Sequence, residues 1–408
     1  MKNIALLTAI ISASAFSSDY IVKVKSNYKN NINLKSMGNS KEIKVSFGEF
    51  HLFSTQDKSI VTSLQNNEAI EYIEPNYTYK ALSAPSDIEF NKQWGLNNTG
   101  KNSSYWFFRG KKGVDVGALK AWGISKGTKQ VKIAVIDTGV DYNHEDLKDN
   151  IMINDLELNG IEGVDDDGNG YVDDIYGYDF ANNDASPMDG NGHGTHCAGV
   201  IGASHNSKGI SGINAKVSIL PIKFLTDRGS GTLEGAIKSI EYAITRKVDI
   251  MNNSWGGGPR SQALFDAIEA AKNSGILFVA AAGNENNDND KKPAYPASYK
   301  LDNVISVGSI DGKGNKSRFS NFGTESVHIF APGTRIYSTV QNNKYKNLSG
   351  TSMACPHVAG VAGLLLANEP NLTYKEIKDK MMSTSVQTGE LTNLSQSGYV
   401  NIFNALTK

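Results

Sequence analysis

The chain has 408 residues, more than one average domain needs, so we expect one large domain and a smaller companion. A hydrophobic fraction of 39% and a charged fraction of 20% are typical of a soluble globular protein, and 2 cysteines are too few for a disulfide-rich scaffold. The formal net charge of −1 argues against a surface that binds nucleic acid or an anionic membrane.

The N-terminus has the features of a secretory signal peptide. Lys2 supplies a positive charge, residues 4–11 form a short apolar stretch, and residues 13–15 offer small side chains to a signal peptidase. The stretch is too short to cross a bilayer, and no cysteine follows it to carry a lipid. We expect residues 1–17 to be removed and the protein to be secreted without a membrane anchor, into the medium or a periplasm. An ordinary buried N-terminal segment is the alternative.

Residues 18–82 are predicted to form a small α+β unit. The segments "DYIVKVKS" and "KEIKVSFGEFHLFS" have the residue pattern of strands, and "KSIVTSLQNN" fits a helix. The unit closes with "AIEYIEPNYTYK", and the Ser/Ala/Pro-rich stretch that follows is typical of an exposed linker.

Residues 83–408 alternate between strand-like and helix-like segments. Short apolar runs rich in β-branched residues predict strands within residues 131–139, 217–225, 248–256 and 276–284. Amphipathic segments predict helices over residues 232–247 and 261–275, and a further helix over 373–383 begins with a capping-box pattern, Thr373 with Glu376. This alternation predicts an α/β fold, a mostly parallel sheet with helices on both faces.

Polar residues stand at the ends of three predicted strands. Asp137 ends the first, Ser254 follows the third, and Asn284 ends the fourth. Because ligands bind at the carboxyl ends of parallel strands, these residues should meet in one crevice.

Two glycine-flanked segments add a histidine and a serine to this crevice. His193 stands between two glycines where a helix of small residues begins, and Ser352 occupies the same position in "GTSMACPHVAG". Pro356 is expected in the first turn of the second helix, where its missing N–H costs little. The N–H of Ser352 would then point outward from a helix N-terminus.

Together these residues predict nucleophilic catalysis. A serine hydroxyl needs a base, which His193 can supply, and Asp137 would fix the histidine tautomer and stabilise the imidazolium. The Ser352 N–H and the Asn284 amide would donate to the oxyanion of a tetrahedral intermediate. Each segment alone is ambiguous, and the four in this order favour catalysis.

The segments "VIDTGVD", "HGTHCAG", "AAAGN" and "GTSMACPHVAG" resemble the signature segments of the subtilisin-like serine proteases. The resemblance covers about residue 90 to the C-terminus and implies a three-layer sandwich around a parallel sheet of about seven strands. It assigns Asp137, His193 and Ser352 to the triad and Asn284 to the oxyanion hole. The order of Asp, His and Ser along the chain also matches that of the family.

The resemblance also implies a substrate cleft and a polypeptide substrate. An extended peptide would add as a strand between two walls, which suits a monomeric endopeptidase of broad specificity. Glu285 matches the floor of the primary specificity pocket, where it would accept a basic side chain or remain a solvated rim charge. The walls would be formed by Gly229, Ser230 and Gly231 on one side and by Ser254, Trp255 and Gly256 on the other.

Residues 18–82 resemble the inhibitory propeptide of the same family. The resemblance implies that this unit assists folding, inhibits the catalytic domain from within the cleft, and is removed autocatalytically. The cut is expected between Tyr79 and Asp87, which leaves residues 83–408 as the catalytic domain.

An acidic loop predicts a structural calcium site. Asp165, Asp167 and Asn169 are spaced two apart, a glycine follows, and Asp173 comes next, as in oxygen-rich calcium loops. The loop departs from an EF-hand because Tyr176 takes the place of the closing glutamate, and a solvated acidic loop is the alternative. The resemblance implies a second calcium site at Asp146 and Asn206.

Three points remain open in the sequence. Cys197 and Cys355, in the helices after His193 and Ser352, are predicted to be buried free thiols, with a disulfide as the alternative. A catalytically inactive protein of this fold that only binds is the alternative to the protease. A nucleotide-binding enzyme is disfavoured because no G-x-x-x-x-G-K-[ST] motif occurs and no G-x-G-x-x-G motif directly joins a strand to a helix.

Overall fold

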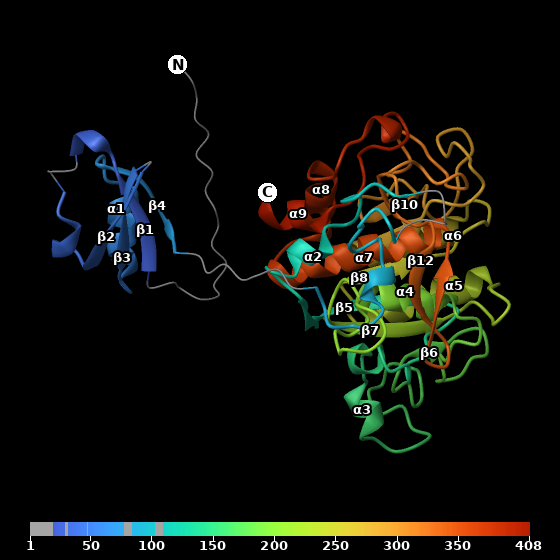
Figure 1. Ribbon diagram of the computed structural model, residues 1–408. Helices are drawn as coiled ribbons and strands as arrows, with labels where there is room; N and C mark the ends of the chain where they lie inside the picture. The colour runs from blue at the N-terminus through green and yellow to red at the C-terminus, as the bar shows by residue number, and fades with distance from the viewer. Residues whose placement is uncertain (1–18, 29–31, 47, 77–83, 103–108) are drawn as a thin grey trace. The chain divides into compact units, whose positions relative to one another are not determined.

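The computed structural model describes residues 19–28, 32–46, 48–76, 84–102 and 109–408. These residues form two compact units, one within 19–76 and one within 84–408 (Figure 1). The predicted signal peptide and residues 77–83, where most of the expected cleavage segment falls, lie outside the described residues. Both assignments therefore stay predictions.

In its described residues, the smaller unit is an antiparallel sheet with one α-helix. Its strand order is β2-β3-β1-β4. The helix α1 (Lys58–Gln65) begins at Asp57, whose carboxylate accepts from the Ser59 N–H and so caps the helix. Leu64 of α1 joins Val22 and Phe53 in a small apolar core. These elements confirm the predicted strands and helix; the strands are β1 (Asp19–Val24), β2 (Asn39–Val45), β3 (Gly48–Ser54) and β4 (Ile70–Pro75).

The larger unit is built on a seven-stranded sheet, and every pairing in it is parallel. The strand order is β11-β10-β9-β8-β5-β7-β6, which confirms the predicted α/β fold. The four predicted strands are β5 (Gly127–Asp137), β7 (Lys216–Lys223), β8 (Ile250–Asn253) and β9 (Leu277–Ala281). Three more were not identified from sequence: β6 (Tyr178–Asp179), β10 (Val304–Ile310) and β11 (Ile329–Pro332).

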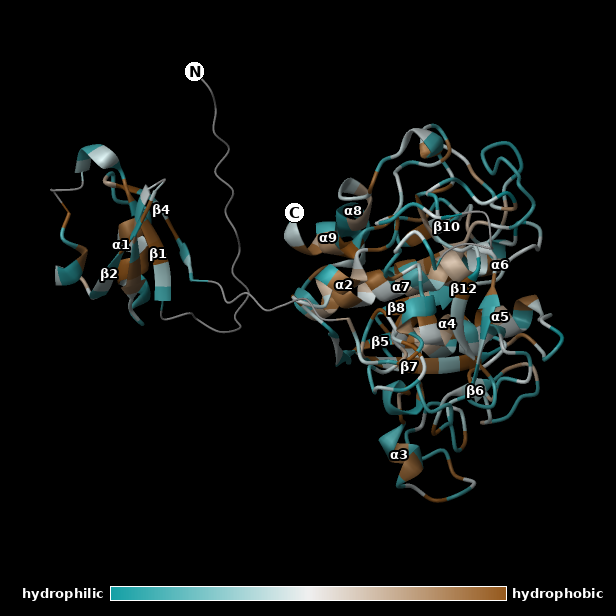
Figure 2. Ribbon diagram, viewed as in Figure 1, coloured by the Kyte–Doolittle hydropathy of each residue, from teal (hydrophilic) through white to brown (hydrophobic). Residues whose placement is uncertain are grey.

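Helices cover both faces of this sheet, so the unit has three layers. On β5, Ile133 and Val135 join a core with α4 (His193–Gly202) and α7 (Thr351–Asn368). Ala134 and Ile136 face the opposite core, with α5 (Leu233–Thr245) and α6 (Gln262–Asn273). Figure 2 shows hydrophobic residues on the central strands and along α7, whereas the outer loops are mainly hydrophilic. Burial on both faces explains the near-continuous apolar runs in the sequence.

The remaining elements pack around this sandwich. The predicted capping box is present on α8 (Tyr374–Ser383), where Thr373 and Glu376 each accept from the other's backbone N–H. Among the described residues, no helix combines the length and apolar composition that crossing a bilayer requires. The other α-helices and strands of the described residues are α2 (Ala118–Ala121), α3 (Asp155–Leu158), α9 (Ile402–Thr407) and the hairpin of β12 (Ile336–Val340) and β13 (Lys344–Leu348).

Candidate active site

The four predicted catalytic residues lie at the carboxyl edge of the sheet. Asp137 is the last residue of β5, His193 the first of α4, and Ser352 the second of α7, while Asn284 follows β9. A cleft of about 660 Å³ is lined by His193, Asn284 and Ser352, and Asp137 is fully buried beside it. The topology of the fold thus brings together residues that are far apart in sequence.

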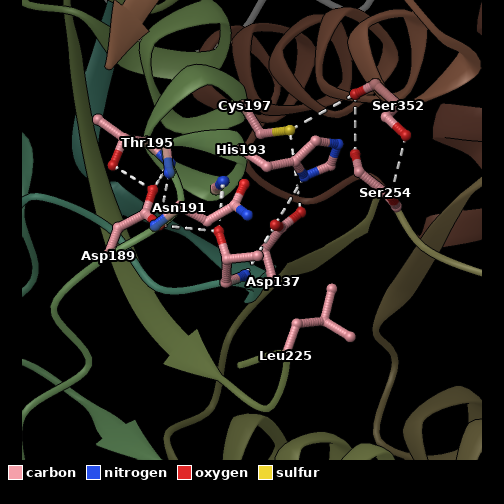
Figure 3. A network of polar contacts seen from close by, with 12 residues as sticks. Asp137, Asp189, Asn191, His193, Thr195, Cys197, Leu225, Ser254 and Ser352 are labelled. Atoms are coloured by element: carbon pink, nitrogen blue, oxygen red, sulfur yellow. Dashed lines mark hydrogen bonds and ion pairs between the residues drawn. The ribbon is translucent and has the colours of Figure 1, made fainter. Parts of the chain in front are cut away.

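Asp137 and His193 form the central pair of the site. The Asp137 Oδ1 lies 2.7 Å from Nδ1 of His193, and it also accepts from the Thr138 N–H at 2.7 Å. This contact places the ring proton on Nδ1 and leaves Nε2 with a free lone pair. Figure 3 shows the imidazole between the Asp137 carboxylate and Ser352.

Burial and charge act in opposite directions on His193. Burial alone lowers the pKa of His193, but the charge of Asp137 and its hydrogen bond outweigh burial, so the net pKa is raised above its usual value. The other histidine of the motif behaves differently. His196 is fully buried, its Nε2 lies between two backbone carbonyls, and desolvation lowers its pKa to about 3. His196 is therefore a neutral structural residue.

Ser352 is held by Ser254 in two ways. The Ser352 hydroxyl donates to the Ser254 carbonyl at 3.0 Å, and among the described residues it makes no hydrogen bond to His193. The Ser254 hydroxyl donates back to the Ser352 carbonyl at 3.0 Å. Rotation about one side-chain bond would release the Ser352 hydroxyl toward Nε2 of His193, and such loosened contacts are common without substrate.

Pro356 explains why the Ser352 carbonyl is free to accept these bonds. The helix α7 begins at Thr351, so Pro356 lies beyond the first turn, and the prediction that it occupies that turn is wrong. Because proline has no N–H, the carbonyl of Ser352 lacks its partner four residues ahead. The Ser254 hydroxyl and the Cys197 thiol take that place, at 3.0 and 3.5 Å.

The predicted oxyanion donors are both presented to the cleft. The Asn284 Oδ1 accepts from the N–H and the hydroxyl of Thr351, at 2.8 and 3.0 Å. These two bonds fix the amide so that its NH₂ group is left for the cleft. The Ser352 N–H lies in the first turn of α7, where backbone N–H groups have no intrahelical acceptor. Thr351, which orients Asn284, was not identified from sequence.

The predicted wall residues all line the cleft. One wall contains Gly229, Ser230 and Gly231, and the other contains Ser254, Trp255 and Gly256. Glu285 lines the same cleft and is exposed, and one of its carboxylate oxygens accepts from the Asn321 amide at 2.9 Å. A pocket side chain held in this way keeps a second carboxylate oxygen for a substrate.

The two cysteines are free and fully buried, which confirms the prediction of free thiols. Desolvation raises the pKa of the Cys355 thiol to about 12 and also raises that of Cys197. The Cys197 sulfur lies 3.9 Å from Oδ2 of Asp137, next to the Asp137–His193 pair.

The acidic loop is arranged differently from its sequence pattern. Carboxylate oxygens of Asp165 and Asp167 lie within 4.8 Å of one another and of Glu157, a buried residue on α3 that sequence reasoning missed. Asn169 lies alongside and donates to Asp167 at 3.1 Å. Asp173, predicted as a ligand, turns its carboxylate to the Gly163 N–H at 2.9 Å, so Glu157 takes its place in the group.

The second predicted calcium site has its oxygen ligands occupied by protein donors. Asp146 is fully buried, which raises its pKa, and it accepts from the Asn206 amide, the Ile210 N–H and the Tyr345 hydroxyl. A cation at this site would have to displace the Tyr345 hydroxyl and turn the Asn206 amide. Calcium at Asp146 and Asn206 stays a prediction.

Comparisons with known proteins agree on one family. The model of the "Subtilase family" of peptidases matches residues 128–400. The chain is 37% identical over 352 residues to "Thermophilic serine proteinase" of Bacillus sp. (strain AK1), covering 86% of this chain and 76% of that protein. It is 38% identical over 306 residues to "Thermitase" of Thermoactinomyces vulgaris, covering 75% of this chain and 98% of that protein.

The chain is also similar to a longer relative and to a solved structure. "Subtilisin-like protease 1" of Plasmodium berghei is 38% identical over 301 residues, which cover 69% of this chain but only 50% of that protein. The chain thus spans about half the length of this relative. A solved cold-adapted subtilisin-like serine proteinase superposes with a TM-score of 0.54 at 32% identity, covering 76% of this chain and 96% of that one.

Proposed function

The chain belongs to the subtilase family, a family of serine endopeptidases, and we propose from this premise that it cleaves polypeptides with Ser352 as nucleophile. The observation that carries the proposal is the 2.7 Å bond from buried Asp137 to His193, beside a serine at the N-terminus of α7. Hydrolysis of a denatured protein, blocked by a serine-directed phosphonate, tests it. A protein that binds the substrate without cleaving it would be the inactive relative instead.

The reaction proceeds through an acyl-enzyme. The Ser352 oxygen attacks the scissile carbonyl carbon while Nε2 of His193 takes the hydroxyl proton. The oxyanion receives hydrogen bonds from the Ser352 N–H and the Asn284 amide. His193 then gives its proton to the leaving amine, and a water molecule, activated by the same nitrogen, releases the acyl group. Asp137 stabilises the imidazolium in both half-reactions.

Substrate would bind as an extended strand between the two walls of the cleft. Main-chain hydrogen bonds supply most of such binding, so specificity is expected to be broad. Glu285, exposed in the cleft and retaining one free oxygen, would favour a basic side chain in the primary pocket.

Replacing Asn284 with Ala is expected to lower kcat by about 10²- to 10³-fold and to change KM little, because its amide acts on the oxyanion alone. Steady-state kinetics on a peptide substrate measure both constants. Asn284→Asp is the matched variant, since it keeps the acceptor for Thr351 and loses the donor, so its kcat should fall as far. Wild-type kcat in both variants would remove Asn284 from the oxyanion hole.

Secretion and self-processing are part of the proposal. We infer that residues 1–17 direct export, that residues 18–82 are an intramolecular inhibitor, and that residues 83–408 form the monomeric catalytic domain. The separate compact unit within residues 19–76 supports a removable prodomain. Cleavage between Tyr79 and Asp87 would release it. The partners are polypeptide substrates and this prodomain, with no nucleic acid.

The acidic loop fits a structural calcium ion. Carboxylates of Glu157, Asp165 and Asp167 converge within 4.8 Å. Asn169 lies beside them with its amide NH₂ group toward Asp167, so it would have to turn its amide to supply an oxygen. Arg246 approaches Asp167 at 3.3 Å, while among the described residues neither Glu157 nor Asp165 forms an ion pair. Hard oxygen donors of this kind suit calcium, which would bring the like charges together and fix the loop without a role in the chemistry.

Chelation by EDTA is therefore expected to lower the melting temperature by about 5 °C relative to excess calcium, through loss of the binding free energy. Differential scanning fluorimetry with and without calcium measures the shift. Asp165→Asn should remove the calcium response, whereas Asp290→Asn, in another loop, should keep it. Equal melting temperatures in calcium and EDTA would contradict the site.

A mercurial is expected to abolish activity, because a mercury atom on the Cys197 sulfur would displace the imidazole of His193. Reaction should be slow since both thiols are buried. Residual activity is measured against the number of thiols modified. Cys197→Ala should resist the reagent and Cys355→Ala should not. Full activity after modification of both thiols would refute the mechanism.

A further inference from the structure

A second buried carboxylate lies beside the Asp137–His193 pair, and the mechanism above gives it no role. Asp189 precedes His193 by 4 residues in the sequence. Its exposed fraction is 3%, and it forms no ion pair among the described residues. A carboxylate that is buried without a basic partner must be stabilised by hydrogen bonds, so its partners show what it holds in place.

Five hydrogen bonds converge on Asp189 (Figure 3). Its Oδ1 accepts from the Thr138 hydroxyl at 2.9 Å and from the N–H groups of Asn191 and Gly192 at 2.8 Å each. Its Oδ2 accepts from the N–H of Thr195 at 3.0 Å and from the Thr195 hydroxyl at 2.6 Å.

These bonds replace a missing helix cap. The N-cap of α4 is Gly192, with φ of 101°, and it has no side chain to satisfy the first N–H groups. Asp189 accepts a hydrogen bond from the Thr195 N–H, and the Thr138 hydroxyl accepts one from the Gly194 N–H at 3.0 Å. His193 is the first residue of this turn, so Asp189 fixes the backbone that carries the imidazole.

The same bonds tie α4 to the end of β5. Thr138 directly follows Asp137, and its hydroxyl donates to Asp189 while accepting from Gly194. The two segments lie so close that a Cβ on Gly194 would stand 3.0 Å from the Cβ of Asp137 and collide with the Gly139 carbonyl. The 2.7 Å contact of Asp137 with His193 therefore depends on how this junction is held.

We propose that Asp189 is a positioning residue for His193: its carboxylate locks the first turn of α4 to the end of β5, and its charge stabilises the imidazolium. The proposal rests on the proposed function. It is supported by the effect of Asp189 on His193, whose pKa is raised by the Asp189 charge in addition to that of Asp137.

Several charged and titratable groups on the neighbouring elements surround His193. His196 stays neutral because burial lowers its pKa to about 3, and the thiols stay neutral because burial raises theirs. The Lys223 ammonium donates to the Thr138 carbonyl at 2.8 Å and pairs with Asp227. Between pH 5 and 8 the imidazole itself is thus the group expected to change charge. The set comprises Asp137, Asp189, His196, Cys197, Lys223, Asp227 and Cys355.

The test compares Asp189→Asn with the wild type in the mature protein, after active sites have been counted with a serine-directed phosphonate. Asparagine cannot accept from all five donors and carries no charge. We expect kcat to fall about ten- to hundredfold, with KM within about twofold. The acid limb of the kcat/KM profile should move to lower pH by at least about 0.3 unit, because losing a nearby negative charge disfavours the imidazolium.

Two further variants separate positioning from charge and from folding. Thr138→Val removes the hydroxyl that links Asp189 to the Gly194 N–H and keeps the Asp189 charge. Its kcat should therefore fall several-fold while the acid limb stays in place, and Thr138→Ser should restore kcat. Asp179→Asn is the matched control, because Asp179 is a buried carboxylate that accepts three N–H groups away from the cleft. Its kcat and acid limb should equal those of the wild type.

Four results of these experiments would overturn the role of Asp189 or the proposed function. A wild-type kcat in Asp189→Asn, or a lower kcat with an unmoved acid limb, would overturn the proposal. If Asp189→Asn does not fold, equal kcat in Thr138→Val and Thr138→Ser overturns it. Failure of the wild type to react with the phosphonate would instead refute the proposed function, before any variant is compared.

Discussion

Replacing Ser352 with Ala is expected to lower kcat for peptide hydrolysis by about 10⁶-fold and to stop removal of the prodomain. Without the hydroxyl, no acyl-enzyme can form, and the oxyanion donors have nothing to stabilise. The intact mass of the secreted product, for wild type and variant, measures the second effect directly. The wild type should lose everything up to a point between Tyr79 and Asp87, whereas the variant should retain its prodomain.

The other outcomes of this experiment are equally informative. Ser349→Ala, a neighbouring exposed serine on the same segment, is the control and should be processed like the wild type. If wild type and Ser352→Ala are trimmed alike, another protease carries out maturation, and self-processing is refuted. If neither is trimmed, the boundary is wrong or the chain is inactive, and the alternative of an inactive binding protein is favoured.

Replacing Asp137 with Asn is expected to lower kcat by about 10⁴-fold while the fold is retained. The Asn amide would donate to Nδ1 of His193, so the ring proton would move to Nε2, and that nitrogen could no longer accept the Ser352 proton. Steady-state kinetics across pH measure the effect, with Asp179→Asn as the control for loss of a buried carboxylate.

Asp137→Asn should also change how kcat/KM depends on pH. In the wild type the Asp137 charge holds the pKa of His193 above its usual value, so kcat/KM should fall as the pH drops through that raised pKa. In Asp137→Asn the raising charge is gone, so the acid limb should move to lower pH. A kcat within tenfold of the wild type, or a limb that moves to higher pH, would contradict the role of Asp137.

Much of the fold could be predicted because its signals are local. The strands of the central sheet are buried on both faces, so β5, β7, β8 and β9 appear as apolar runs whatever surrounds them. The rule that ligands lie at the carboxyl ends of parallel strands then located Asp137 and Asn284. Of the three other strands, β6 has two residues and β11 four, and serine and glycine residues interrupt the apolar run of β10.

The residues that sequence reasoning missed act through contacts between distant segments. Asp189 carries a recognisable signal, an acidic residue just before a helix, but its partner Thr138 lies 51 positions away. Ser254 was predicted to line the cleft, yet its hydroxyl also supports Ser352, 98 positions away. Only the folded chain shows that such pairs meet.

In the acidic loop, the sequence pattern predicted the wrong residue. The regular spacing of Asp165, Asp167 and Asn169 made Asp173 the natural next ligand. The backbone at Asp173 instead has a positive φ of 56°, and its carboxylate turns to the Gly163 N–H. Glu157 fills the position from α3. The sequence shows only a glutamate between two leucines there, and its burial is seen in the structure.

The most direct test of the central claim is covalent labelling with a serine-directed phosphonate, followed by peptide mapping by mass spectrometry. One adduct per mature molecule is predicted, on Ser352, because that hydroxyl has His193 and the oxyanion donors beside it. Labelling should vanish in Ser352→Ala and slow strongly when His193 is replaced with Ala. An adduct on another serine, or no adduct while denatured protein is still cleaved, would contradict Ser352 as the nucleophile.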